Sequence, residues 1–217
     1  MNTHDWTIGD INNISLPPYP TCRNNIGQQP MHITHADFFH YAGQDWKINN
    51  KGSGCYLNIL NSLFKLIISY QQQHYRLLAI RYDLHQASSV DSNKRMTVFF
   101  RRLNKQLNAK YQGIDMRYAW VREQATANAP HYHILLLLNG QVVRHPHKVS
   151  LICQRIWQEM SGSIFFPENL YYLVSRSDQR RLAQLIYRVS YFAKGKDKEN
   201  RPEQTKSFGC SRCELKN

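Results

Sequence analysis

Three side chains in the middle of the chain have the types and spacing of a divalent-metal site. His131 and His133 flank Tyr132 at the start of an apolar run, and Glu123 precedes them across a short polar segment. Side chains two apart on a β-strand point to the same face, so the imidazoles project together and Tyr132 projects to the other face. Two imidazoles and one carboxylate on a rigid sheet can hold a divalent metal and leave coordination positions for substrate oxygens.

A β-hairpin must position these three residues. Residues 117–123 and 132–138 are rich in β-branched, aromatic and aliphatic types, and the segment between them contains Ala, Asn and Pro. If Glu123 lies opposite or diagonal to His131, its carboxylate joins both imidazoles on one face. The alternative is that these histidines are ordinary hydrogen-bonded residues of an apolar strand.

A predicted helix over residues 178–194 carries the second reactive group. Its core-facing stripe consists of Leu182, Leu185, Ile186, Val189 and Phe192. Tyr187, Tyr191 and Lys194 follow one another at spacings of four and three, so we expect them to gather on the opposite side. A phenol with a pKa of ~10 is a poor nucleophile unless a nearby cation stabilises the phenolate. Lys194 is placed to do so, although tyrosines are also common on the surface of basic helices.

The composition indicates a polyanionic partner. The formal net charge is +13, the pI is about 9.7 and aromatic residues make up 12% of the chain. Nucleic acid is preferred over a membrane surface, because Lys and Arg bind phosphates while aromatic side chains stack on bases. The arginines that we expect to contact DNA are Arg81, Arg101, Arg102, Arg122 and Arg188. For Arg101 and Arg102, which belong to the basic face of a predicted helix, a solvated surface is the alternative.

The remaining periodicity predicts an α+β fold, in which a central antiparallel sheet has helices packed mainly on one face. Helices are expected over residues 55–71, 149–160 and after an Asp91-Ser92 cap, with strands over 75–84 and 170–174. Asp83 and His85 end the first strand; they either approach the metal face or, as preferred here, are solvated strand-end residues. The expected organisation is an irregular N-terminal arm (1–50), one domain (51–200) and a basic C-terminal tail (201–217).

The cysteines, and the histidines outside the hairpin, are not assigned to a functional site. Five cysteines without framework spacing fit a reducing compartment. Because the chain also lacks a secretory signal at its start and an apolar run of about 18 residues, we expect a cytoplasmic protein. Cys210 and Cys213 have the spacing of half a zinc site but are interpreted as incidental thiols, and His145 and His147 are interpreted as surface loop histidines.

Taken together, Glu123, the His131-Tyr132-His133 strand and the Tyr191-Phe192-Ala193-Lys194 helix end resemble the motifs of HUH endonucleases. One branch of that superfamily is more similar still: the inovirus replication-initiator family, also called the YagK/YfjJ C-terminal domain. The resemblance covers residues 70–212. The segments that carry it are Arg81-Tyr82-Asp83-Leu84, Trp120-Val121-Arg122-Glu123-Gln124, Pro130-His131-Tyr132-His133, Ser190-Tyr191-Phe192-Ala193-Lys194 and Ser207-Phe208-Gly209-Cys210-Ser211-Arg212. The chain departs from the usual pattern at Tyr132, where an aliphatic residue is typical.

The resemblance implies a nuclease domain over residues 51–200, in which Glu123, His131 and His133 hold Mg²⁺ or Mn²⁺. Tyr191 would attack a phosphodiester of single-stranded or hairpin origin DNA, Lys194 would steady the phosphate, and Tyr187 is a candidate second nucleophile. This is the initiating step of rolling-circle replication of a phage or prophage element in a bacterial cytoplasm. The chain has no Gly-x-x-x-x-Gly-Lys-Ser/Thr motif, so a host helicase and a host polymerase would be partners.

Two alternative functions stay open at this point. The first is a prophage DNA-binding regulator that keeps the same scaffold but does not cut DNA. The second is a transposase or relaxase of the same superfamily. A relaxase usually has a third metal-binding histidine and an N-terminal tyrosine, whereas the tyrosine here comes late in the chain.

Overall fold

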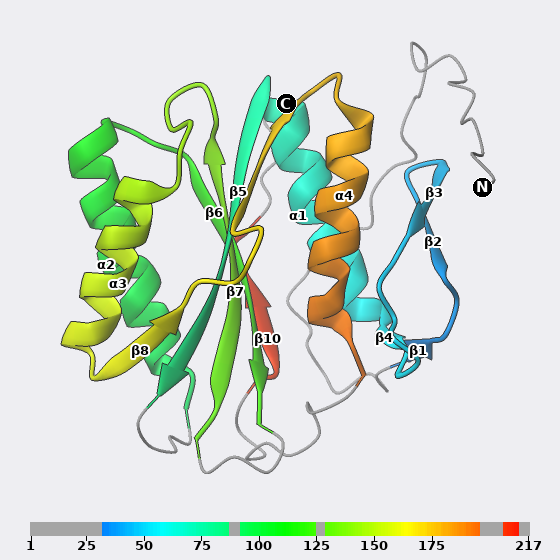
Figure 1. Ribbon diagram of the computed structural model, residues 1–217, viewed down its shortest axis with the longest axis horizontal. Helices are drawn as coiled ribbons and strands as arrows, with labels where there is room; N and C mark the ends of the chain where they lie inside the picture. The colour runs from blue at the N-terminus through cyan, green and yellow to red at the C-terminus, as the bar shows by residue number, and fades with distance from the viewer. Residues whose placement is uncertain (1–31, 87–91, 125–128, 196–205, 213–217) are drawn as a thin grey trace.

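A six-stranded antiparallel sheet forms the centre of the computed structural model, which describes residues 32–86, 92–124, 129–195 and 206–212 (Figure 1). The strands are β5 (Arg76–Gln86), β6 (Met116–Glu123), β7 (His131–Asn139), β8 (Gly162–Phe165), β9 (Tyr171–Ser175) and β10 (Phe208–Cys210). Their order is β10-β6-β7-β5-β8. Two strands share the outer edge of β5: β8 pairs with residues 83–86, and β9 pairs with residues 76–80. The predicted α+β class, its central antiparallel sheet and the β6–β7 hairpin are confirmed.

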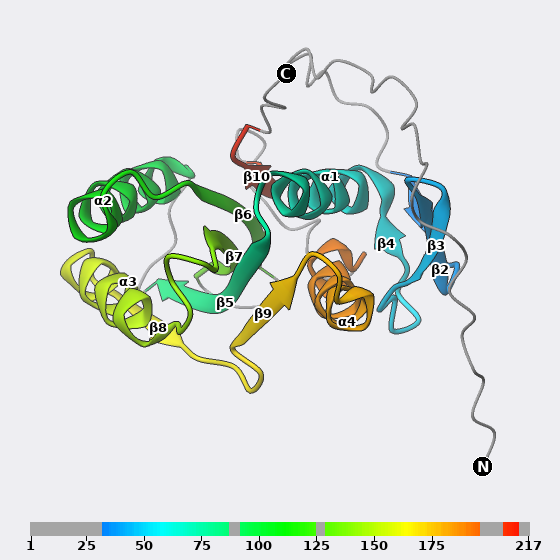
Figure 2. The ribbon, with the colours of Figure 1, turned by 90° about the horizontal axis from the view of Figure 1, so that it is seen from above.

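Within the described residues, four helices cover the sheet, two on each face (Figures 1 and 2). They are α1 (Leu57–Gln73), α2 (Lys94–Tyr111), α3 (His147–Glu159) and α4 (Gln179–Ser190). The expectation that helices pack mainly on one face is corrected, because α2 and α3 lie on one side and α1 and α4 on the other. The reason lies in β7, where every residue from Tyr132 to Leu138 is buried. A strand buried on both faces needs a helical layer on each.

The alternation of side chains along β7 divides the interior into two cores. Leu135 and Leu137 pack with α1 and α4, whereas Ile134 and Leu136 pack with α2 and α3. The same alternation continues into the histidine motif. It places His131 and His133 on the α1 and α4 side and the buried Tyr132 on the α2 and α3 side, as the strand pattern predicts.

The N-terminal region differs from the expected irregular arm. Residues 1–31 lie outside the described residues, but residues 32–50 contain β1 (Ile33–Thr34), β2 (Phe38–Tyr41) and β3 (Gln44–Lys47). β1 pairs with β4 (Cys55–Tyr56), β2 pairs with β3, and Trp46 and Ile48 are buried in the core beside α1 and α4. Strands of two to four residues are too short to produce a recognisable period, so they could not be predicted from residue spacing.

The expected C-terminal tail also contributes to the sheet. Within residues 206–212, β10 pairs with β6 and extends the sheet beyond the strand that carries Glu123. Gly209 allows this close approach, because a Cβ at that position would lie 2.8 Å from the Trp120 ring. A three-residue strand that contains glycine carries almost no sequence signal.

Other boundaries follow the predictions within a few residues, apart from two details. β8 was not expected, and the predicted cap residue Asp91 lies outside the described residues. At the N-cap of α2, Asn93 makes no capping hydrogen bond with its side chain. None of the helices in the described part of the chain is long and apolar enough to span a membrane.

Candidate metal and nucleophile site

Strand pairing brings Glu123, His131 and His133 together. Glu123 lies opposite His131 in the β6–β7 register. Oε2 of Glu123 lies 3.0 Å from Nε2 of His133 and 3.5 Å from Nε2 of His131, and one ligand atom from each residue lies within 4.8 Å of the others. Glu123 and His133 are buried, whereas His131 is half-buried. The cluster is therefore rigid on its inner side and accessible beside His131.

The donor set suits a divalent cation. Two imidazole nitrogens and one carboxylate oxygen converge, which leaves further positions for water or phosphate oxygens. Imidazole is a softer ligand than the oxygens that Mg²⁺ prefers, so among the two expected ions the set fits Mn²⁺ better. In metal sites, a ligating histidine commonly donates its second ring N–H to a carboxylate. His133 has such a partner in Asp83.

Asp83 belongs to this site, which corrects the preferred interpretation of a solvated strand end. It lies opposite His133 in the β5–β7 register, and its Oδ1 is 2.5 Å from Nδ1 of His133. Its carboxylate is buried, and both of its oxygens accept hydrogen bonds from Arg81 at 3.3 Å. His85, two residues further along β5, is exposed, and its ring stacks on His131 with 5.5 Å between centroids.

The charges of this cluster depend on one another. Burial alone would lower the pKa of His133, but hydrogen bonds to Asp83 and Glu123 raise it above its ordinary value. Burial alone would raise the pKa of Asp83, but His133 and Arg81 lower it. Burial and then the neighbouring His131 lower the pKa of His85. The two carboxylates thus favour positive charge at the position of His133, where a divalent cation would bind.

The predicted nucleophile lies next to the cluster. The helix was expected to continue to Lys194, but α4 ends at Ser190 and a single 3-10 turn follows, Tyr191–Ala193. This turn places the Tyr191 ring 6.2 Å from the His133 ring, centroid to centroid, while the buried Phe192 ring stacks on His133 at 5.6 Å. The structure therefore brings the late tyrosine and the histidine strand into one site.

Among the described residues, three cationic side chains from separate segments lie around the Tyr191 ring. Nζ of Lys194 lies 5.3 Å from the centre of the ring, Nζ of Lys51 lies 5.5 Å away, and the Arg81 guanidinium carbon lies 5.7 Å away. Lys194 was predicted to lie near Tyr191. Lys51 was missed, since it belongs to the loop before β4 and forms no pattern with the other site residues. Cations at these positions can attract an approaching phosphate.

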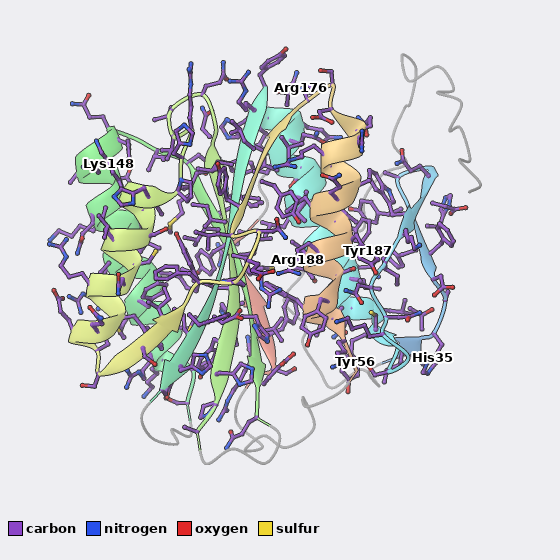
Figure 3. All side chains as sticks on the ribbon, in the orientation of Figure 1. His35, Tyr56, Lys148, Arg176, Tyr187 and Arg188 are labelled. Carbon is purple, nitrogen blue, oxygen red and sulfur yellow. The ribbon has the colours of Figure 1, made fainter. Side chains whose placement is uncertain are left out.

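Tyr187 is not part of these contacts. It is 41% exposed on α4, and its backbone carbonyl accepts a hydrogen bond from the Ser190 hydroxyl. Figure 3 shows Tyr187 and Arg188 on opposite sides of α4, with Arg188 toward the sheet. Arg188 donates a hydrogen bond to the backbone carbonyl of Glu168 at 3.0 Å. The ring contacts described for Tyr191 and the cluster involve neither residue.

Of the five arginines expected to bind DNA, only Arg81 lies at the cluster. Arg122 is 2% exposed and projects to the α2 and α3 side of the sheet, where it donates a hydrogen bond to Gln124. Arg101 and Arg102 lie on α2, across the sheet from Tyr191, and Arg102 forms an ion pair with Glu159. A strand alternates its side chains between faces, so a basic residue next to Glu123 in sequence points away from it.

The other candidate motifs remain outside the site. His145 and His147 are exposed, as expected, although His147 begins α3 and does not lie in a loop. Cys210 is an exposed cysteine on β10. Its predicted companion Cys213 lies outside the described residues.

Comparison with known proteins agrees with the resemblance at the family level. Residues 40–211 match the YagK/YfjJ C-terminal domain family. The chain is 24% identical over 197 residues to a protein of Escherichia coli (strain K12) named "Uncharacterized protein YagK", in an alignment that covers 73% of this chain and 94% of that protein. No solved structure matches the chain. The match to the family spans most of the chain and includes every residue of the cluster and the 3-10 turn, so the protein belongs to the YagK/YfjJ C-terminal domain family.

Proposed function

We propose that the protein is an HUH-type endonuclease of the inovirus initiator kind, which nicks and rejoins single-stranded DNA to begin rolling-circle replication. The observation that carries this proposal is the position of Tyr191, whose ring centre is 6.2 Å from that of His133. A phenol beside a two-histidine, one-carboxylate cluster is the arrangement that attack on a metal-bound phosphodiester requires. The three cations around the same ring give further support.

The proposed reaction assigns a task to each residue. Glu123, His131 and His133 would hold the cation, which would polarise the scissile phosphate and offset the charge that develops on it. The phenol oxygen of Tyr191 loses its proton and forms a bond to phosphorus, and the bond from phosphorus to the 3′ oxygen breaks. The products are a 5′-phosphotyrosyl link and a 3′-hydroxyl, which gains a proton. Lys194 holds the phosphate, and the free 3′-hydroxyl is the primer for a host polymerase.

The charge balance of the cluster supports an anionic substrate. With both ring nitrogens of His133 protonated, the two carboxylates of Asp83 and Glu123 balance the charges of Arg81 and the imidazolium. When a divalent cation replaces one proton of this imidazolium, the four side chains and the cation together carry one net positive charge. A buried excess charge is costly unless a counterion approaches, and one phosphodiester supplies it. The neighbouring Lys51 and Lys194 extend the positive field toward solvent.

The proposed substrate is single-stranded or hairpin DNA at an origin, because the backbone must reach the half-buried Tyr191 without its complementary strand. The proposed setting is a bacterial cytoplasm in which host helicase and polymerase extend the nicked strand. Tyr187, one helical turn before Tyr191, is the candidate for the second transesterification that closes the displaced circle.

The decisive experiment is a search for a DNA-modified peptide. Purified full-length protein is incubated with Mn²⁺ and a pool of single-stranded oligonucleotides from candidate origin regions, and the digest is analysed by mass spectrometry. We expect the adduct on Tyr191 and none with Tyr191→Phe. Equal adduct formation by Tyr191→Phe would refute the assigned nucleophile. DNA binding without any adduct, and without any effect of Mn²⁺, would instead identify a non-catalytic DNA-binding regulator.

A further inference from the structure

Asp83 is not one of the three proposed metal ligands, but its carboxylate contacts one of them, His133. Its Oδ1 lies 2.5 Å from Nδ1 of His133, and the two residues are 8% and 6% exposed. They lie opposite each other on the two central strands, β5 and β7, so both backbones are fixed by the sheet. Water has little access to either group. The protein groups around His133 therefore determine which of its ring nitrogens carries a proton.

Those neighbours compete for the two ring nitrogens of His133. When neutral, the ring carries one N–H, and an ionised carboxylate only accepts hydrogen bonds. Glu123, at 3.0 Å from Nε2, favours the proton on Nε2, which would block that nitrogen as a metal ligand. Asp83 favours the proton on Nδ1, which leaves the Nε2 lone pair directed at Glu123 and His131.

Arg81 could support the opposite arrangement, since it can donate to an unprotonated Nδ1. However, its nitrogen lies 3.4 Å from Nδ1, whereas the Asp83 oxygen lies at 2.5 Å. Arg81 instead donates to both oxygens of Asp83, and its guanidinium also packs 5.3 Å from the centre of the Phe192 ring. It therefore holds Asp83 ionised and in place as the acceptor for Nδ1–H.

We propose that Asp83 is a positioning residue of the metal site: it holds His133 with its proton on Nδ1, so that Nε2 is available to the cation. The proposal rests on the metal-binding part of the proposed function and is independent of DNA cleavage. An outer carboxylate of this kind typically changes metal affinity by about 10- to 100-fold when it is replaced.

The first test measures Mn²⁺ binding to the full chain by electron paramagnetic resonance of the free ion. Asp83→Asn keeps the shape of the side chain and removes its charge, and we expect its Mn²⁺ affinity to fall by about 10- to 100-fold. The matched control is Asp115→Asn. Asp115 also lies between a histidine and an arginine, 3.1 Å from His74 and 2.9 Å from Arg117, but on a different part of the protein. Asp83→Asn with the affinity of the wild type would overturn the proposal.

The second test needs no substitution at Asp83 and so does not depend on how that variant folds. Long-range ¹H–¹⁵N spectra of the wild type with bound Zn²⁺, a diamagnetic stand-in, report the proton position on each histidine, and His133→Gln assigns the signal. We expect a proton on Nδ1 of His133. A proton on Nε2 would overturn the proposal. Neither test uses DNA, so a protein that binds Mn²⁺ as expected but never nicks DNA would refute the proposed function alone.

Discussion

The ring of Tyr191 meets the ring of His133 edge to face, with 6.2 Å between their centres. One residue follows the last helix and the other lies on a central strand of the sheet. Their contact joins the two reactive groups of the sequence in one site, with Phe192 stacked on the same imidazole. A substitution of Tyr191 or of His133 therefore tests whether the two groups act in one site.

The hydroxyl of Tyr191 is expected to be essential for covalent attachment and dispensable for the fold. Tyr191→Phe keeps the ring that packs near His133 and removes only the attacking oxygen. We expect no covalent DNA adduct on a denaturing gel, with Mn²⁺ and DNA affinities unchanged. Tyr187→Phe is the control, because Tyr187 is exposed on α4 outside the described ring contacts. It should form the first adduct at the rate of the wild type, and its failure to do so would contradict the assigned order.

Divalent metal should stabilise the folded protein through the three-residue cluster. A ligand that binds only the folded state at 100 times its dissociation constant adds about 2.7 kcal/mol to the free energy of unfolding. We expect Mn²⁺ to raise the melting temperature more than Mg²⁺ does at equal concentration, and EDTA to reverse the shift. In His131→Ala the shift should disappear. A shift of the same size in that variant would place the metal elsewhere.

Lys51 is expected to assist the reaction although it lies outside the tyrosine motif. Its Nζ lies 5.5 Å from the centre of the Tyr191 ring, on the loop before β4. Loss of one charge-assisted contact of about 1.5 kcal/mol corresponds to a rate about tenfold lower. Lys51→Ala should therefore slow adduct formation by about tenfold without changing Mn²⁺ affinity. Lys51→Arg should recover most of the rate.

The matched control for Lys51 is Lys105→Ala, which removes an exposed lysine of α2 on the other side of the sheet. It should leave the rate of adduct formation unchanged. Equal slowing by both variants would mean that net charge, and not the position of Lys51, determines the rate.

Buried tyrosines should make the fold sensitive to alkali. Burial raises the pKa of Tyr82 well above its ordinary value, and its hydroxyl lies 2.9 Å from that of Ser150. Because the pKa of Tyr82 is raised in the folded state, its contribution to the free energy of unfolding is fully present below the unfolded-state pKa of ~10. It is lost as the pH rises further, since the unfolded chain releases the proton first. Urea midpoints should therefore fall steeply above that pH.

Tyr82→Phe supplies the comparison. At neutral pH it should lower the free energy of unfolding by about 1 kcal/mol, for the lost hydrogen bond. Above pH ~10 its stability should fall less steeply than that of the wild type. A partial slope should remain, because burial also raises the pKa of Tyr70. Identical slopes would show that Tyr82 does not titrate on unfolding.

Local sequence patterns were sufficient to predict contacts between strands that follow one another in the chain. The alternation of His131, Tyr132 and His133 and the polar turn before them predicted that Glu123 would meet the imidazoles, since hairpin strands pair with their immediate neighbours. The position of Asp83 depends on the pairing of β5 with β7, which spans helix α2 and strand β6. No local period encodes that pairing, so the carboxylate looked like a strand end.

Packing between distant segments accounts for the other differences. Tyr191 reaches His133 only because α4 lies on the face that carries the odd-numbered residues of β7. Lys51 reaches Tyr191 because the loop before β4 lies beside the turn after α4, where Cys55 and Lys194 form an isolated β-bridge. Such contacts depend on how whole layers assemble, so residue spacing alone does not reveal them.

The short strand β10 has a consequence for how the protein can be shortened. It occupies the outer hydrogen-bonding edge of β6, and Ser207 extends the contact by accepting a hydrogen bond from the backbone N–H of Arg122 at 2.8 Å. A chain cut before Lys206 would leave that edge open to strands of other molecules. Self-association would then begin at the strand that bears Glu123, so truncation from this end endangers solubility and the metal cluster together.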